Sequence, residues 1–510
     1  MRGRLLSSLG AGDRRRVLAV AAAILLLALG SRVFLALWLA NDESDDGRLY
    51  SLIARNVVEH GSFSIEEWPP WEPTYIRMPG YPLFLAAVYG TFGGGSDGAV
   101  RVIQAFVDLL GCLGVGLLAL RWAPDGWEPR RKARALLWGL ALAAFCPFSA
   151  IYVACILSES WSTTLTVLFA LAASRGLVSE GRKAFVLWGL AGLAAGLATL
   201  FRPDSGLLAA AGGATLVLKW LRDMRLSPEP PAPRVGIRAP FFQGAALTLG
   251  FVLALAPWIV RNAATFGVFE PLAPRNANMP GEFVPHGYGA WLRTWVTDFK
   301  YVDPYEWEAD TQPMSVEGLP AWAADSPEER ARVGELFSRY NRRLEEGKGR
   351  TGRHGTPRAL DRELDHEFMA LAREREARHP LRTYLVLPLV RAASMWFDSH
   401  TLYYPWSGEL FPLRQPDRET GDLVWQALFL SLTWVYTILG LAGAWFLLRW
   451  RGTVPFALLL LLTIVPRVAF LGTMENPEPR YVVELFPLLA AAGAVAIAAL
   501  TSRTKRAVEA

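Results

Sequence analysis

Long runs of apolar residues recur along most of this sequence, and they restrict the chain to folds that shelter such runs from water. Of its 510 residues, 52% are hydrophobic, and the mean hydropathy is +0.23. A helix of about 20 apolar residues is long enough to cross a bilayer. Soluble domains do not cluster their apolar residues in this way. The sequence therefore predicts an all-α polytopic membrane protein.

The apolar runs predict about ten transmembrane helices. They lie near residues 17–39, 99–121, 135–157, 160–178, 184–201, 204–221, 241–260, 423–448, 454–472 and 481–500. No acidic residue is expected deep inside any of these spans. The first run follows a cluster of arginines and is longer than the apolar core of a signal peptide, so we expect a retained anchor.

Basic clusters orient these spans, because cytoplasmic loops carry an excess of Lys and Arg. With ten or so spans, every basic cluster falls on one side, and both termini are then cytoplasmic. The clusters are the N-terminus and residues 121–134, 175–183, 222–238, 449–451 and 503–506. Two shorter apolar stretches, 81–92 and 384–397, would break this pattern as spans and are expected to be interfacial.

The predicted spans divide the chain into successive domains. Residues 1–260 form an N-terminal transmembrane module, which includes a first outer loop at 40–98. Residues 261–422 form an extracytoplasmic, mainly helical cap that contains the interfacial segment 384–397. Residues 423–510 form the C-terminal transmembrane helices and a short cytoplasmic tail.

Acidic residues gather directly after the first span, in NDESDDGRLY from Asn41 to Tyr50. The periodicity of residues 47–60 predicts an amphipathic helix, and Gly61 is a natural stop. Either Asp45 or Asp46 is expected as its N-cap, because exposed amides and the helix dipole favour an acid there. Capping and catalysis both remain open for these aspartates, and holding a divalent cation is a less favoured third use.

Other charged residues lie at the outer ends of the predicted spans. Arg77, in the stiff stretch IRMPGYP, suits either a lipid phosphate or simple snorkelling. Glu159 interrupts two apolar runs, where an acid is either functional or solvated in a surface hairpin. The positive-inside rule does not explain Arg202, Arg261 and Arg480 on this acidic side. Together these residues suggest a site for an anionic lipid that also contains a base.

These motifs, in this order, resemble the GT-C membrane glycosyltransferases, and specifically the bacterial branch of protein O-mannosyltransferases and lipid A aminoarabinose transferases. The matching pieces are DDGRLY, RMPGYP, SES, RP, PWIVRN and PRY. The resemblance implies a GT-C fold with juxtamembrane helices in the first outer loop and a small periplasmic cap. It also implies a bacterial inner (plasma) membrane protein whose active site faces outward.

The resemblance further implies a reaction in which a sugar passes from a polyprenyl-phosphate donor to an acceptor hydroxyl, with inversion. Asp46, four residues before Tyr50, takes the position of the catalytic base, with Asp45 as a neighbouring alternative. Glu159 matches the second-loop acid of the catalytic site and would orient the acceptor or Asp46. The implied donor-phosphate ligands are Arg77 and Arg480, joined by Arg202 and Arg261. Support for the acceptor or the helices is implied for Tyr50, Tyr81 and Tyr481.

No cofactor is implied as required. The aminoarabinose transferases carry a Glu-Lys-Pro-Pro type sequence where this chain has Ile76 to Pro79, so the acid available for a metal is absent. A divalent cation is thus an option that the motifs do not support. The implied partners are the lipid-linked sugar, a glycan, lipid or protein acceptor and the bilayer, with no nucleic acid.

Two other classes of function remain. An ion-coupled transporter or a flippase of lipid-linked sugars would also place charges at the outer membrane face. Against it stand the lack of an inverted repeat and the expected absence of acids deep inside the spans. A catalytically silent protein that binds lipid-linked sugars is the third class. The cysteines, Cys112, Cys146 and Cys155, have no disulfide or metal-site spacing.

Overall fold

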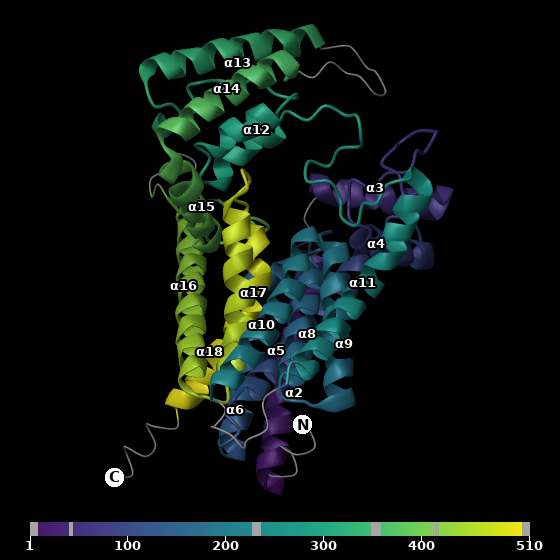
Figure 1. The fold of residues 1–510 in the computed structure, drawn as a ribbon, viewed down its shortest axis with the longest axis vertical. Helices are drawn as coiled ribbons and strands as arrows, with labels where there is room; N and C mark the ends of the chain where they lie inside the picture. Colours follow the sequence, from purple (N-terminus) through teal and green to yellow (C-terminus); the bar gives the residue numbers. More distant parts are fainter. Residues whose placement is uncertain are drawn as a thin grey trace. The chain divides into compact units, whose positions relative to one another are not determined.

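The computed structural model describes residues 9–39, 44–226, 236–347, 359–408, 410–411, 413 and 418–501. Every regular element in these ranges is a helix, as predicted (Figure 1). The chain packs as two units. Unit 1 comprises Met1–Ala277, Ser399–Val465 and Val483–Ala510, and unit 2 comprises Asn278–Asp398 and Pro466–Val482.

Long apolar helices make up most of unit 1. In chain order they are α2 (Ala11–Trp38), α5 (Asp97–Trp122), α6 (Pro129–Ala144), α8 (Glu159–Gly176), α9 (Gly181–Phe201), α10 (Leu207–Leu226), α11 (Arg238–Phe266), α16 (Thr420–Arg449) and α18 (Phe486–Leu500). Helix α17 (Val454–Gly472) begins in unit 1 and ends in unit 2. Helix α18 packs against α5, α6 and α16 and is buried along most of its length.

Among the described residues, seven helical stretches are long and apolar enough to cross a membrane, or eight if a bent pair is one span. They are α2, α5, α9, α11, α16, α17 and Pro479–Leu500. This confirms a multi-pass membrane protein. The predicted spans at 160–178 and 204–221 exist as helices α8 and α10 but are not among the seven, so the number of spans stays a prediction.

The span predicted at residues 135–157 is wrong as a single helix. Helix α6 ends at Ala144, and the pair of short helices α7 (Pro147–Ala150) and η1 (Ile151–Val153) is bent from it by 51°. The cause is Pro147, because a proline inside a helix lacks the amide donor and its ring clashes with the carbonyl four residues earlier. We call residues 145–158 the bent segment.

The stretch between the long helices α2 and α5 folds into two short helices that pack on each other, α3 (Asp45–His60) and α4 (Gly80–Phe92) (Figure 1). The predicted amphipathic helix and its stop are confirmed, since Gly61 takes a left-handed φ of 68° after α3. Helix α4 starts at Gly80, where an added Cβ would lie 2.6 Å from the Leu200 carbonyl oxygen. Only glycine therefore allows α4 to approach the end of α9 so closely.

Unit 2 is built from α12 (His286–Arg293), α13 (Pro327–Gly347), α14 (Arg362–Arg378) and α15 (Leu387–Trp396). Its core is aromatic, with Trp291, Trp295, Phe337 and Phe368 all buried. Short helical turns complete both units: η2 (Pro203–Gly206), η3 (Phe299–Tyr301), η4 (Asp303–Trp307), η5 (Ala321–Ala323), η6 (Arg382–Val386) and η7 (Pro479–Leu485). The predicted domain boundaries at 261 and 422, and the interfacial placement of 81–92 and 384–397, stay predictions.

Candidate functional site

Helix α3 is capped by a serine, not by an aspartate. The Ser44 hydroxyl accepts a hydrogen bond of 3.1 Å from the Gly47 amide. The prediction that Asp45 or Asp46 is the N-cap is therefore wrong, because the cap lies one residue earlier. The Asp45 side chain lies outside the described part of the chain. The N-cap of α3 is Ser44, and Asp46 is the second residue of the helix.

Asp46 instead meets Arg77, which comes from the loop before α4. Arg77 Nη2 donates to Asp46 Oδ1 at 3.3 Å, and the two side chains are 27% and 26% exposed. The neighbours of Arg77, Ile76 and Met78, are buried and hold this loop in place. A partly exposed ion pair contributes little free energy, about 0–1 kcal/mol. Both groups are therefore accessible, and a ligand can replace either one as the partner of the other.

Glu159 lies in a second and deeper group of charges. Arg202 Nη1 donates to Glu159 Oε1 at 2.8 Å, and Arg202 Nε lies 3.1 Å from Glu484 Oε1 and 3.5 Å from Asp204 Oδ1. The Glu159 side chain is 2% exposed, so its interpretation as a solvated acid in a surface hairpin is wrong. We call Glu159, Arg202, Asp204 and Glu484 the buried charge cluster.

Sequence reasoning did not assign Glu484, although an acid near the start of the last predicted span, 481–500, is a recognisable signal. In the buried charge cluster three carboxylates lie around one guanidinium. A donor phosphate would have to compete with them for Arg202. The geometry therefore favours Arg77 over Arg202 as the group that meets a ligand.

Arg261 is enclosed by rings and backbone. Its Nη1 donates to the Thr74 carbonyl oxygen at 2.7 Å, and its guanidinium carbon lies 5.0–5.5 Å from the ring centroids of Phe63, Trp258 and Phe266. It ties the end of α11 to the loop that leads to Arg77. Its predicted contact with phosphate stays a prediction.

The predicted support tyrosines Tyr50 and Tyr81 do meet. Their rings pack edge to face with centroids 5.3 Å apart. The Tyr81 hydroxyl donates to Gln104 Oε1 at 2.8 Å inside the core. The sequence analysis did not identify Gln104, on α5, because one glutamine in an apolar run is a weak signal. Tyr81 therefore supports the packing of helices, and contact with an acceptor stays a prediction for both tyrosines.

Arg480 and Tyr481 belong to unit 2. There Arg480 Nε lies 2.6 Å from Glu478 Oε1, and its guanidinium carbon lies 5.6 Å from the centroid of the Tyr481 ring. The Tyr481 hydroxyl accepts from Asn476 Nδ2 at 3.3 Å. The Arg480 side chain is 10% exposed. The predicted roles of these two residues stay predictions.

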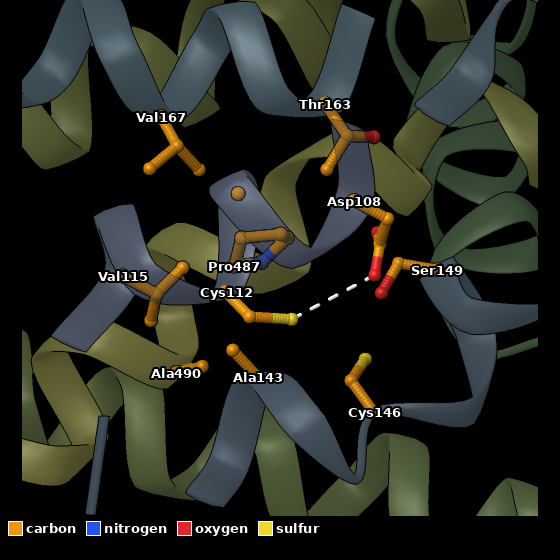
Figure 2. A pocket seen from close by; sticks show the side chains of 11 residues that line it. Asp108, Cys112, Val115, Ala143, Cys146, Ser149, Thr163, Val167, Pro487 and Ala490 are labelled. Carbon is orange, nitrogen blue, oxygen red and sulfur yellow. Dashed lines mark hydrogen bonds between the residues drawn. The ribbon is translucent and has the colours of Figure 1, made fainter. Parts of the chain in front are cut away.

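The expectation of no acid deep inside a span is wrong. Asp108, in the middle of α5, accepts from Arg32 Nε of α2 at 2.8 Å, and both side chains are almost fully buried. Arg32 also donates to the carbonyls of Ala143 and Ala144, at the end of α6. Figure 2 shows a cavity that Asp108 lines, with the Cys112 thiol directed at Asp108. The charges therefore satisfy each other and the helix end.

Metal use is not tested by these contacts. Within the described ranges, no group of three or more His, Cys, Asp or Glu side chains could hold a metal ion. The acidic run before α3 lies partly outside those ranges.

No protein-family model matches the sequence, and no curated protein is a significant match. Several solved structures do align with the chain. AglB, an oligosaccharyltransferase from Archaeoglobus fulgidus in complex with an inhibitory peptide and a dolichol-phosphate, aligns over 96% of this chain at 14% identity and a TM-score of 0.45. This chain covers 51% of that structure, about half its length.

ArnT from Cupriavidus metallidurans bound to undecaprenyl phosphate aligns over 95% of this chain and 78% of its own, at 17% identity and a TM-score of 0.35. The arabinosyltransferase EmbB from Mycobacterium smegmatis aligns over 94% of this chain and 41% of its own, at 15% identity and a TM-score of 0.32. The structures similar to this chain are GT-C membrane glycosyltransferases. The similarity concerns the arrangement of helices and assigns no role to any residue.

Proposed function

We propose that this chain is a membrane glycosyltransferase that moves a sugar from a polyprenyl-phosphate carrier to an acceptor hydroxyl. One observation carries the proposal: Asp46 Oδ1 lies 3.3 Å from Arg77 Nη2, and both side chains are partly exposed. A carboxylate can accept the proton of a hydroxyl. A guanidinium can bind a phosphate through two parallel hydrogen bonds. The two groups that the reaction needs are therefore adjacent and accessible.

The proposed reaction begins with an exchange of partners. The donor phosphate replaces Asp46 as the partner of Arg77, and the freed carboxylate accepts the proton of the acceptor hydroxyl. The acceptor oxygen then bonds to the anomeric carbon while the bond from that carbon to the phosphate oxygen breaks. The phosphate leaves with the bonding electrons, and Arg77 stabilises the charge that develops on it. Attack opposite the leaving phosphate inverts the anomeric centre.

Glu159 has an indirect part in this proposal. Because it is buried and pairs with Arg202, it orients the start of α8 and does not touch the acceptor. The proposed setting is a bacterial inner membrane with both termini in the cytoplasm and the reaction on the outer face. The transferred sugar is a hexose or pentose, and the acceptor is a glycan, a lipid or a protein.

The test is envelope mass spectrometry on a strain that lacks this chain and is complemented with variants at equal expression. Wild type restores a sugar-sized mass, whereas Asp46→Asn lowers transfer by roughly 10²–10⁴-fold, as expected for a lost general base. Glu59→Gln, an exposed acid at the other end of α3, is the matched control and restores transfer fully. If Asp46→Asn restores the mass equally well, the base is not Asp46 and this proposal is wrong.

Binding is measured separately, by native mass spectrometry of the purified protein with undecaprenyl phosphate as the probe. Asp46→Asn retains the lipid, because it keeps Arg77. Arg77→Ala weakens lipid binding by about tenfold or more, since a charged hydrogen bond contributes roughly 1.5–3 kcal/mol. If Arg77→Ala and wild type bind the lipid equally well, Arg77 is not a ligand of the donor phosphate.

An ion-coupled transporter is the second candidate, and Asp108 is the observation that favours it, because acids inside spans often serve ion pathways. The Arg32 contact at 2.8 Å argues for a structural role. Reconstituted vesicles separate the two. Proton uptake that depends on a lipid-linked sugar and is lost in Asp108→Asn would establish transport. We expect no such proton uptake by the wild-type protein.

A further inference from the structure

The bent segment contains buried backbone that lies outside regular helices. Its residues 148–158 are all buried, yet after η1 the chain runs through turns without regular helical hydrogen bonds. Buried carbonyls without partners are costly, and the cost is greatest in membrane-spanning regions, which lack water. The partners of these carbonyls therefore determine how the segment is held.

Helix α5 supplies those partners from one face. Gln104 Nε2 donates to the Cys155 carbonyl oxygen at 2.8 Å and lies 3.4 Å from the carbonyl oxygens of Tyr152 and Val153. One turn earlier on α5, Arg101 Nε donates to the Ala154 carbonyl oxygen at 3.0 Å. The Gln104 side chain is fully buried.

The other end of the Gln104 amide is also engaged. Its Oε1 accepts from the Tyr81 hydroxyl at 2.8 Å, so one side chain joins α4, α5 and the bent segment. The tyrosine also fixes the amide orientation, because the oxygen must face the hydroxyl while the nitrogen faces the carbonyls. A leucine of similar size would fill the space but make none of these bonds.

The bent segment also touches the helix that carries the proposed base. An added Cβ on Gly47, next to Asp46, would lie 3.2 Å from the Ile156 carbonyl oxygen, so the start of α3 rests directly on the segment. Three residues after Ile156 the chain reaches Glu159. Any shift of residues 152–156 therefore moves both acids.

We infer that Gln104 is a positioning residue, which holds the bent segment so that Asp46 and Glu159 keep their places. Its catalytic consequence rests on the proposed function, but its structural part does not. A purely local role, satisfying buried carbonyls, would leave transfer unchanged. The two are distinguished by measuring the packing of the segment and the turnover of the enzyme independently.

The chain provides its own reporters of packing. Cys146 and Cys155 lie in the bent segment and Cys112 lies on α5, and all three are buried free thiols. Reaction with N-ethylmaleimide, followed by intact mass and peptide mapping, therefore reports when the segment opens. The protein is purified in detergent as the full chain, and no substrate is needed.

The variants are Gln104→Leu and the milder Tyr81→Phe, which removes one bond to Gln104. The matched control is Thr164→Val, which removes a buried hydrogen bond of 3.0 Å to the α5 carbonyl of Val107, away from the segment. We expect N-ethylmaleimide to react with Cys155 at least about tenfold faster in Gln104→Leu than in wild type, because the loss of buried hydrogen bonds favours local opening. In Tyr81→Phe, Cys155 reacts at an intermediate rate. In Thr164→Val, it reacts at the wild-type rate.

Turnover is measured in the transfer assay that Asp46→Asn calibrates. We expect Gln104→Leu to lower transfer by about 100-fold, the effect of a displacement of about 1 Å in a site, while native mass spectrometry shows undecaprenyl phosphate bound as in wild type. Unchanged Cys155 labelling in both variants would overturn the inference, and so would faster labelling with full turnover. Full turnover of Asp46→Asn would instead overturn the proposed function and leave the labelling result standing. If Gln104→Leu does not fold, Tyr81→Phe decides by the same criteria.

Discussion

Ser44 and Gly47 are joined by a hydrogen bond of 3.1 Å that caps α3 and leaves Asp46, between them, to pair with Arg77. Neighbouring residues thus have separate tasks, one in stability and one in the proposed chemistry. The tasks can be tested separately, because the cap can be changed without touching either member of the ion pair.

We expect Ser44→Ala to lower the free energy of unfolding by about 1 kcal/mol, because it removes an N-cap. Ser44→Asn is the control, since asparagine caps equally well, and it keeps the stability of wild type. Thermal unfolding in detergent measures both. If Ser44→Ala unfolds at the wild-type temperature, the cap seen here does not contribute to stability.

The buried charge cluster leads to a second prediction. Arg202→Met leaves three carboxylates without their shared guanidinium, so we expect it to cost about 3–5 kcal/mol of stability, as for other broken buried pairs. Arg55→Met, at an exposed position on α3, is the control and changes stability little. Equal unfolding temperatures for the two variants would show that Arg202 does not hold this cluster together.

Unit 2 should lose stability in acid through Asp325. Burial alone would raise the pKa of Asp325, but the hydrogen bond from Arg382 and the charges of Arg375 and Arg378 outweigh it and lower that pKa below 3.8. A lowered pKa means that the carboxylate stabilises the fold above its unfolded value of 3.8. This stabilisation is lost as the pH falls through the lower folded value.

Asp325→Asn should therefore unfold more easily than wild type at neutral pH. The difference between the two should shrink as the pH falls below about 3.8. Unfolding followed by tryptophan fluorescence at each pH measures this, with Glu335→Gln, an exposed acid of α13, as control. A difference that is independent of pH would assign the effect to packing and not to charge.

Close contact between α9 and α11 gives a fourth prediction. An added Cβ on Gly250 would lie 2.1 Å from the Gly189 carbonyl oxygen, whereas one on Gly244, in the same helix, would meet nothing within 4 Å. We expect Gly250→Ala to cost about 1–3 kcal/mol, because it forces the helices apart. Gly244→Ala should be neutral or stabilising by up to about 1 kcal/mol. Thermal unfolding tests this, and we expect Gly250→Ala to unfold at a lower temperature than Gly244→Ala. The reverse order would contradict the close packing of α9 and α11.

Patterns that act over short distances were readable from the sequence. Apolar runs predicted the long helices, and the periodicity of residues 47–60 with Gly61 predicted α3 and its end. The resemblance to GT-C enzymes singled out Asp46, Arg77, Glu159 and Arg202, which the structure joins in two pairs. Hydropathy averages over a window, however, so it did not detect the break that Pro147 makes or the acid in the middle of α5.

The sequence by itself determined that the chain is a multi-pass helical membrane protein with an acidic first loop, because apolar length and charge are properties of consecutive residues. Only the tertiary structure decided how each charge is used. Glu484 meets Arg202 across 282 positions of the chain, and Arg32 meets Asp108 across 76. No spacing rule predicts such contacts, since they depend on which helix faces pack together. That packing leaves Asp46 and Arg77 accessible and buries Glu159.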